Sequence, residues 1–174
     1  RDVLGLAFDP RRIEGIDIAH LHGGETVGAL VSFVDGLPSR ERYRRFKIKT
    51  VVGVDDFASV REVVTRRYGR LLRENQPLPD VIMIDGGIGQ LHAAPQALRE
   101  VTGDANFGAE RPFLCSLAKK EEIIYSLKHT DGLKLPRRSP ALRVLQYVRD
   151  EAHRFSRHYH HILRRKNVLG EDDK

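Results

Sequence analysis

The sequence predicts an α/β fold in which helices pack against one mixed β-sheet. Strand patterns separated by turn residues extend as far as Thr50, and strand and helix patterns alternate after it. The first arrangement is typical of antiparallel strands, and the second is typical of parallel strands linked by helices. At 174 residues the chain has the length of one domain with a single core.

Three antiparallel strands are expected first. Alternating apolar residues over 13–19 and β-branched residues over 26–34 predict two strands, joined by a turn over 22–25. A second turn over 35–38 leads to a third strand over 42–49. The three strands therefore form a meander before any helix begins.

Helices and buried strands alternate in the rest of the chain. Asp55 and Asp56 stand at an N-cap position, and a helix to about residue 73 follows them. Its apolar stripe consists of Phe57, Val60, Val64, Tyr68, Leu71 and Leu72. Further elements are expected over 81–84 (strand), 90–101 (helix), 112–118 (strand), 122–127 (edge strand) and 128–138 (loop). Ser139-Pro140 is a cap and first-turn pair that opens the last helix.

Several folds share this outline, and the ribonuclease H-like fold is one of them. We expect residues 1–12 to be a lead-in from a missing upstream segment, residues 13–166 to form the domain, and residues 167–174 to be a frayed tail. No apolar run approaches the length of a membrane span, and no secretory pattern opens the chain. The sequence therefore predicts a cytoplasmic fragment with no membrane partner.

Basic residues outnumber acidic residues by 30 to 24, which gives a net charge of +6 and a pI near 9.7. A polyanion is therefore the first partner to consider. Cys115 is the one cysteine, so it makes no internal disulfide, and its apolar neighbours predict a packed thiol in a reducing compartment. A single cysteine also leaves no zinc pattern to compete with other metals.

Asp85 ends an apolar run and precedes three glycines, in the string Ile84-Asp85-Gly86-Gly87-Ile88-Gly89-Gln90. A run without polar alternation is typical of a strand buried on both faces, and ligands gather beyond the carboxyl ends of such strands. Asp85 is therefore a candidate ligand, with capping of the next helix as the alternative. The glycine spacing matches neither a phosphate-binding loop nor a dinucleotide-binding fingerprint.

Asp17 lies within the first expected strand, between Ile16 and Ile18. A buried carboxylate needs a positive partner, which a metal ion supplies, whereas strand alternation could instead point Asp17 to solvent. Asp17 and Asp85 on neighbouring strands would make an oxygen site suited to Mg²⁺ or Mn²⁺. His153 follows Ala152 at the rim of the last helix's apolar stripe, where an imidazole can reach a cleft, although a lone helical histidine is more often structural.

A basic strand is the main candidate for binding a phosphate backbone. Six of the ten residues over 40–49 are basic, and aromatic residues are interleaved with them. The alternative is a solvated edge strand whose charges oppose aggregation. The predicted phosphate contacts are Arg44, Arg45 and Lys47 from this strand, Lys119 after the strand over 112–118, and Arg154 from a second basic run beside His153.

Seven strings follow one another along the chain: Gly15-Ile16-Asp17-Ile18-Ala19-His20, Tyr43-Arg44-Arg45-Phe46, Asp55-Asp56-Phe57-Ala58, Arg66-Arg67-Tyr68, Ile84 to Gln90, Leu117-Ala118-Lys119-Lys120-Glu121-Glu122, and Leu145-Gln146 with Arg149 to Phe155. In order and spacing, they resemble the endonuclease half of the UvrC family of bacterial excision-repair nucleases. The resemblance covers about residues 12–166. So many ordered strings are far more specific than any one of them.

The resemblance implies a ribonuclease H-like domain that makes the 5′ incision in the damaged DNA strand during nucleotide excision repair. It also implies a divalent metal and a catalytic triad of Asp17, Asp85 and His153. Damaged double-stranded DNA and UvrB would be the partners, with the UvrB-docking segment expected to be absent from this chain.

The chain departs from the family pattern at Ile88, where lysine is usual, at Ala19, where serine is usual, and at Ser156-Arg157. These departures concern a phosphate contact and local polarity rather than the triad. Two alternatives stay open: a catalytically weakened DNA-binding module of the same fold, and a phosphate-ester enzyme that acts on a small anion.

Overall fold

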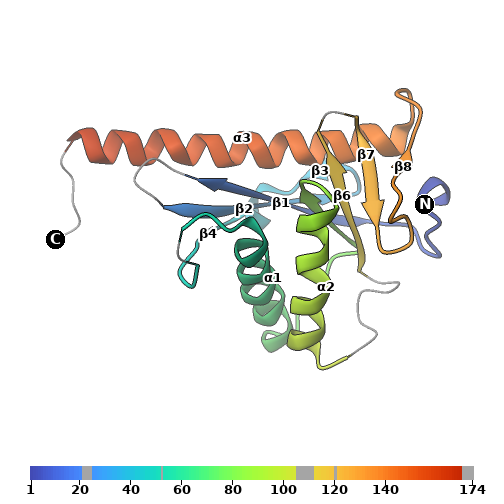
Figure 1. Ribbon diagram of the computed structural model, residues 1–174, viewed down its shortest axis with the longest axis horizontal. Helices are drawn as coiled ribbons and strands as arrows, with labels where there is room; N and C mark the ends of the chain where they lie inside the picture. The colour runs from blue at the N-terminus through green and yellow to red at the C-terminus, as the bar shows by residue number, and fades with distance from the viewer. Residues whose placement is uncertain (21–24, 52, 105–111, 120, 170–174) are drawn as a thin grey trace.

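A computed structural model describes residues 1–20, 25–51, 53–104, 112–119 and 121–169, with side chains described as far as His158. One mixed sheet forms the centre of the molecule (Figure 1). The long helix α3 (Pro140–Leu169) covers one face of the sheet, and α1 (Asp56–Arg73) and α2 (Ile88–Thr102) cover the other. The predicted α/β class is confirmed.

The strand order is β3-β2-β1-β5-β6-β7-β8, and β4 also pairs with β2. The bounds are β1 (Arg12–His20), β2 (Thr26–Val34), β3 (Leu37–Pro38), β4 (Arg44–Lys47), β5 (Val81–Asp85), β6 (Phe113–Ala118), β7 (Ile123–Ser126) and β8 (Leu133–Lys134). The central strands β1, β5 and β6 are parallel, whereas the flanking strands pair antiparallel. This arrangement gives three adjacent strands whose carboxyl ends share one edge.

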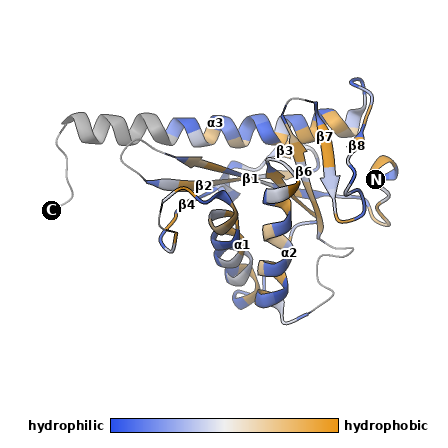
Figure 2. Ribbon diagram, viewed as in Figure 1, coloured by the Kyte–Doolittle hydropathy of each residue, from blue (hydrophilic) through white to orange (hydrophobic). Residues whose placement is uncertain are grey.

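Two apolar cores lie on the two faces of the sheet. The α3 side contains Val31, Phe33, Met83 and Leu117 with Val148 and Ala152 of α3. The other side contains Ile16, Ile82 and Ile84 with Val60 and Val64 of α1 and Leu91 and Leu98 of α2. Figure 2 shows hydrophobic colours concentrated in the central strands between these helices. Residues before β1 contribute too, since a short 3₁₀ helix, η1 (Asp2–Leu4), buries Leu4 in the α3-side core.

Most elements expected from the sequence are present. The carboxylate of Asp55 accepts a hydrogen bond from the Ala58 amide at 3.0 Å, so the predicted N-cap of α1 is confirmed. Cys115 is buried, and burial raises the pKa of its thiol to about 12, as expected for a packed, unreactive cysteine. Among the described residues, no helix has both the length and the apolar character needed to cross a bilayer.

Four local expectations were wrong. Leu37–Pro38, expected within a turn, pairs with β2 as β3. The third strand is shorter than 42–49 because the 3₁₀ helix η2 (Arg40–Arg42) precedes β4. The loop over 128–138 contains β8, which is too short to leave a sequence pattern. Ser139-Pro140 opens α3 as predicted, and the Ser139 carbonyl accepts a hydrogen bond from the Arg143 amide, but the Ser139 hydroxyl makes no capping hydrogen bond with any described residue.

Two other expectations fall partly outside the described residues. Of the predicted turn over 22–25, residues 22–24 lie outside them. The tail expected from residue 167 begins as helix, because α3 continues to Leu169, and residues 170–174 lie outside the described part.

Glycines let the helices approach the sheet on both faces. A Cβ at Gly15 of β1 would lie 2.5 Å from Cγ1 of Val148 on α3, and a Cβ at Gly28 of β2 would lie 2.4 Å from Cγ2 of Val63 on α1. Both distances are shorter than any normal carbon contact. The glycine in β1 therefore sets how closely α3 lies over the strand that carries Asp17.

Candidate active site

The two predicted carboxylates lie side by side at the carboxyl ends of β1 and β5. These strands are parallel neighbours, with Gly15 opposite Met83 and Ile16 opposite Ile84. Because side chains alternate along a strand, Asp17 and Asp85, one step further on, share the face that Gly15 and Met83 present to α3. Strand register thus places both carboxylates beneath α3.

Asp17 is buried rather than solvent-facing, with 5% of its surface exposed. Burial raises the pKa of the Asp17 carboxyl; His153 opposes this effect and Asp85 adds to it. One oxygen of Asp85, Oδ1, is buried and has no hydrogen-bond partner among the described residues. The solvent alternative for Asp17 is therefore wrong, and Asp85 lacks the protein partner that would satisfy its buried oxygen.

His153 meets both carboxylates from α3. Its Nδ1 lies 3.1 Å from Asp17 Oδ1 and 3.4 Å from Asp85 Oδ2. His153 follows the fully buried Ala152, and a third of its side chain is exposed. The prediction that this rim position lets the imidazole reach a cleft agrees with these distances.

The three side chains suit a hard divalent cation. Each offers one ligand atom, and these atoms lie within 4.8 Å of one another, the only such group among the residues that the structure describes. Ligands around an ion with bonds of about 2.1 Å lie about 3 Å apart, close to the observed separations from His153. Two carboxylates and one imidazole are ligands that divalent cations take in proteins. The unsatisfied Asp85 oxygen is the observation that a bound ion would explain.

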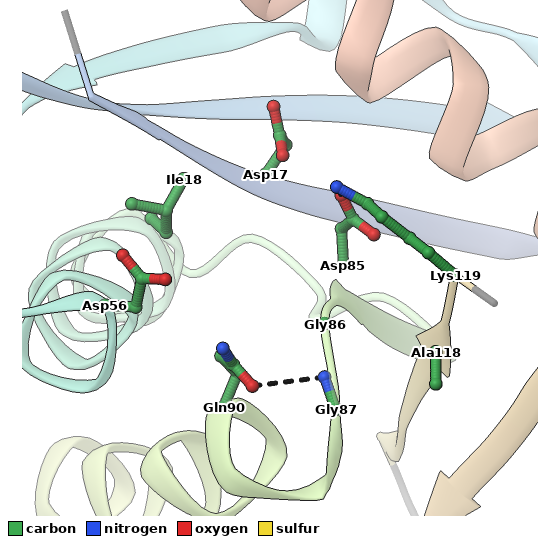
Figure 3. A pocket seen from close by; sticks show the side chains of 9 residues that line it. All are labelled: Asp17, Ile18, Asp56, Asp85, Gly86, Gly87, Gln90, Ala118 and Lys119. Atoms are coloured by element: carbon green, nitrogen blue, oxygen red, sulfur yellow. Dashed lines mark hydrogen bonds and ion pairs between the residues drawn. The ribbon is translucent and has the colours of Figure 1, made fainter.

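Two small pockets open beside these residues. The first, of about 290 Å³, is lined by Asp17, Ile18, Asp56, Asp85, Gly86, Gly87, Gln90, Ala118 and Lys119 (Figure 3). The second, of about 250 Å³, is lined by Asp17, Ile18, Ala19, Lys119, His153, Ser156 and Arg157. Asp17 and Lys119 border both pockets, and Lys119 Nζ lies 3.2 Å from Asp85 Oδ2. A positive charge therefore stands directly over the paired carboxylates.

The other predicted phosphate contacts lie away from these pockets. Arg44 donates hydrogen bonds to the carbonyls of Glu41 and Tyr43. Lys47 pairs with Glu25 at 2.5 Å. Arg154 donates hydrogen bonds from Nε and Nη2 to the Glu151 carboxylate. Their role in DNA binding stays a prediction.

Arg45 is tied to α3 instead. Its guanidinium carbon lies 4.1 Å from the centre of the Phe155 ring, and that ring packs edge-on against Tyr43. The Tyr43 hydroxyl donates to Glu151 at 2.9 Å. The basic strand is thus braced against the helix that carries His153, two residues before Phe155.

Some residues that line the pockets were not predicted from the sequence. Asp56 looked like a helix cap, yet it lines the first pocket and its Oδ1 lies 2.6 Å from His20 Nε2. Gln90 accepts a hydrogen bond from the Gly87 amide at 3.1 Å, which closes the glycine turn. A polar residue in the third helical position is the available signal for such a cap. Arg157, noticed as a departure from the family, borders the second pocket, and no ion pair is described for it.

Comparisons with known proteins identify the family of this chain. The family model "UvrC RNAse H endonuclease domain" matches residues 1–156. UvrABC system protein C of Acidobacterium capsulatum is 52% identical over 161 residues, covering 92% of this chain and 24% of that protein. The corresponding protein of Koribacter versatilis is 50% identical, covering 92% of this chain and 25% of that protein. The chain thus spans about a quarter of the length of these relatives.

Solved structures show weaker likeness. Endonuclease V of Ciona intestinalis, in complex with DNA containing an inosine followed by a ribo-adenosine, has a TM-score of 0.43 and 14% identity over 66% of this chain and 48% of that chain. Human endonuclease V has a TM-score of 0.39 and 20% identity over 64% of this chain and 46% of that chain. The match of the family model to 156 residues and the 52% identity are much stronger, and they show that this chain belongs to the UvrC ribonuclease H endonuclease domain family.

Proposed function

We propose that this domain hydrolyses DNA phosphodiester bonds with a divalent cation, Mg²⁺ or Mn²⁺, held by Asp17, Asp85 and His153. The observation that carries the proposal is the meeting of these three side chains, from β1, β5 and α3, with ligand atoms within 4.8 Å of one another. Within the full-length protein, we propose that the domain makes the 5′ incision in the damaged strand and works with UvrB, as the family resemblance implies.

Each side chain then has a defined task. A cation bound here would polarise a phosphate oxygen and lower the pKa of a bound water. Asp17 and Asp85 hold that ion. His153, whose other face is partly open to solvent, ligates it or orients and deprotonates the attacking water. Lys119, above Asp85, stabilises the negative charge that develops on the phosphate.

In this proposal the bound DNA strand extends from the first pocket along the second, which shares Asp17 and Lys119 with it. Lys119 and Arg157 border that pocket, and no described carboxylate pairs with Arg157. Arg154 is already neutralised by Glu151. Arg157→Ala should therefore weaken DNA binding and lower its salt dependence by about one phosphate contact. Arg154→Ala, a matched basic residue on the same helix, should change binding less; equal losses would contradict this path.

The central test is nicking of a supercoiled plasmid and of a lesion-containing duplex, with Mg²⁺, with Mn²⁺ and with EDTA. Asp17→Asn should abolish metal-dependent nicking and leave DNA binding largely intact. Asp35→Asn is the matched control, because Asp35 is an exposed carboxylate paired with Arg11 on another part of the surface. Undiminished nicking by Asp17→Asn would refute the assignment.

The same assay separates the alternatives. A catalytically weakened binding module would retain DNA without cutting it under any metal condition. An enzyme for a small phosphate ester would bind DNA weakly, with little dependence on salt. End-labelled strands cut by the full-length protein would show whether the incision lies 5′ of the lesion, and addition of UvrB would test that partnership.

A further inference from the structure

Phe57 is an aromatic residue that the fold leaves exposed beside the candidate active site. The helical pattern places it on the apolar stripe of α1, and Val60 and Val64 of that stripe are fully buried. Phe57 is nevertheless 51% exposed as a residue, and Val54, three residues earlier, is 79% exposed. Phe57 is therefore not part of the core, and its exposed surface is available to a ligand.

The position of Phe57 is fixed by the first turns of two helices. It directly follows Asp56, which lines the first pocket. A Cβ built on Gly89 of α2 would lie 2.8 Å from Cε1 and 3.1 Å from Cζ of Phe57, so one edge of the ring rests on that turn. Gln90, the next residue, lines the same pocket, and Figure 3 shows Asp56 and Gln90 on the side away from Lys119.

This contact explains the third glycine of the Asp85–Gln90 string. Any side chain at Gly89 would displace the ring, because a Cβ does not approach other carbons within 3 Å. Gly89 therefore leaves room for the Phe57 ring beside the first turn of α2, while about half of the surface of Phe57 stays exposed. A ring that is positioned but not buried can bind a flat partner without further ordering.

We propose that Phe57 is a stacking platform for one nucleobase of the DNA strand whose phosphate occupies the first pocket. The proposal rests on the proposed nuclease function and adds a base contact to it. Aromatic side chains beside a nucleic-acid groove stack on unpaired bases of any sequence, since every base has a π-face. A nuclease for damaged DNA meets bases whose stacking in the duplex is already weakened.

A protein segment is the other class of occupant for an exposed apolar residue. The nucleobase is favoured because Phe57 follows Asp56 and lies against Gly89, next to Gln90. Asp56 and Gln90 line the pocket that also contains Asp17, Asp85 and Lys119. A strand held there by its phosphate carries its neighbouring base to the pocket rim. The two occupants differ in one measurable respect, which is whether the Phe57 contribution depends on the presence of bases.

The test compares two single-stranded probes of equal length and charge: an oligothymidine and a strand built entirely of abasic residues. Binding is measured by fluorescence anisotropy with the Asp17→Asn variant of the whole chain, which does not cut the probe. Phe57→Leu is added to this background, and Phe57→Trp tests whether another aromatic ring substitutes. Tyr147→Leu is the matched control, because Tyr147 is 50% exposed and packs edge-on against Phe33, which lies near the carboxyl end of β2.

Phe57→Leu should weaken oligothymidine binding by about fivefold to a hundredfold, the range for loss of one base–aromatic stack, and leave abasic binding unchanged. Phe57→Trp should retain affinity, and Tyr147→Leu should affect neither probe. Equal losses on both probes, or no loss on oligothymidine, would overturn the proposal, as would failure of the parent to bind either strand. This binding assay does not measure cleavage. If the wild type fails to nick DNA in the separate nicking assay, the proposed nuclease function is refuted, and the base-dependence of the Phe57 contribution is still decided by the binding data.

Discussion

Replacing Gly15 with alanine should displace α3, and with it His153, from the two carboxylates. The new Cβ would lie 2.5 Å from Cγ1 of Val148, whereas carbon atoms in contact need about 3.5 Å, so strand and helix must separate by about 1 Å. His153 lies five residues after Val148 on the same rigid helix. Misplacement of a catalytic group by about 1 Å lowers the rate by about a hundredfold, and overpacking costs about 1–3 kcal/mol of stability.

Two further variants separate displacement of the site from general destabilisation. Gly28→Ala creates a similar clash, 2.4 Å from Val63, on the opposite face of the sheet, where α1 rather than α3 must move. It should lower the free energy of unfolding by a similar amount and slow cleavage much less. Val148→Ala removes the clashing methyl groups, so combining it with Gly15→Ala should restore most of the cleavage rate.

The assay is metal-dependent nicking at a temperature where circular dichroism shows every variant to be folded. Cleavage by Gly15→Ala at the wild-type rate would refute the argument that this glycine sets the position of α3. So would equal rates for Gly15→Ala and Gly28→Ala, or a failure of Val148→Ala to rescue.

Three other predictions follow from buried groups. Arg67→Met should lower the free energy of unfolding, measured by chemical denaturation, by about 3–5 kcal/mol, because the fully buried Glu14 carboxylate loses the two hydrogen bonds of 2.6 Å and 3.2 Å that Arg67 donates. Adding Glu14→Gln should recover much of that loss. Additive losses from the two substitutions would contradict the pairing. Without metal, Asp17→Asn should be more stable than the wild type at neutral pH. Burial raises the pKa of Asp17, so the folded state holds the proton more tightly than the unfolded chain does. The stability of the wild type should therefore fall as the pH rises from about 4 through the raised pKa. A difference in the free energy of unfolding between the wild type and Asp17→Asn that stays constant over that pH window would refute this. Cys115, with its pKa raised to about 12 by burial, should resist thiol reagents at about pH 8 until the chain unfolds, and rapid labelling of the folded protein would contradict its packing.

The strand positions of Asp17 and Asp85 could be predicted from the sequence because they depend on local patterns. Asp85 ends an apolar run and Asp17 interrupts another, so both were expected on central strands. Which face they share depends on the register between β1 and β5, which pairs residues far apart in the chain. His153 could be placed on a helix rim, but its distance from Asp17 depends on how closely α3 approaches β1, and that is decided at Gly15.

Tertiary contacts decided the features that the sequence did not predict. The helical pattern placed Phe57 in the core, and its exposure follows from where α2 begins beside α1. The charge within a strand pattern indicated a buried carboxylate at Asp17. The same pattern applies to Glu14, which was not predicted to be buried and whose partner Arg67 lies on α1. Four of the five predicted phosphate contacts turned out to have protein contacts of their own outside the two pockets, which charge counting along a strand or helix cannot show.

The departure at Ile88 has a different consequence from the one that the family pattern suggests. Ile88 is the first residue of α2 and does not line either of the two pockets beside Asp17, whereas Gly86, Gly87 and Gln90 line the first. Positive charge reaches the carboxylates from β6 instead, through Lys119, and reaches the second pocket from α3, through Arg157. Loss of a lysine at position 88 therefore removes charge from the glycine turn but not from the paired carboxylates. Because the proposed metal ligands come from β1, β5 and α3, their geometry depends on strand register and on Gly15. A change in the glycine turn can therefore alter the proposed phosphate contacts without disrupting the three ligands.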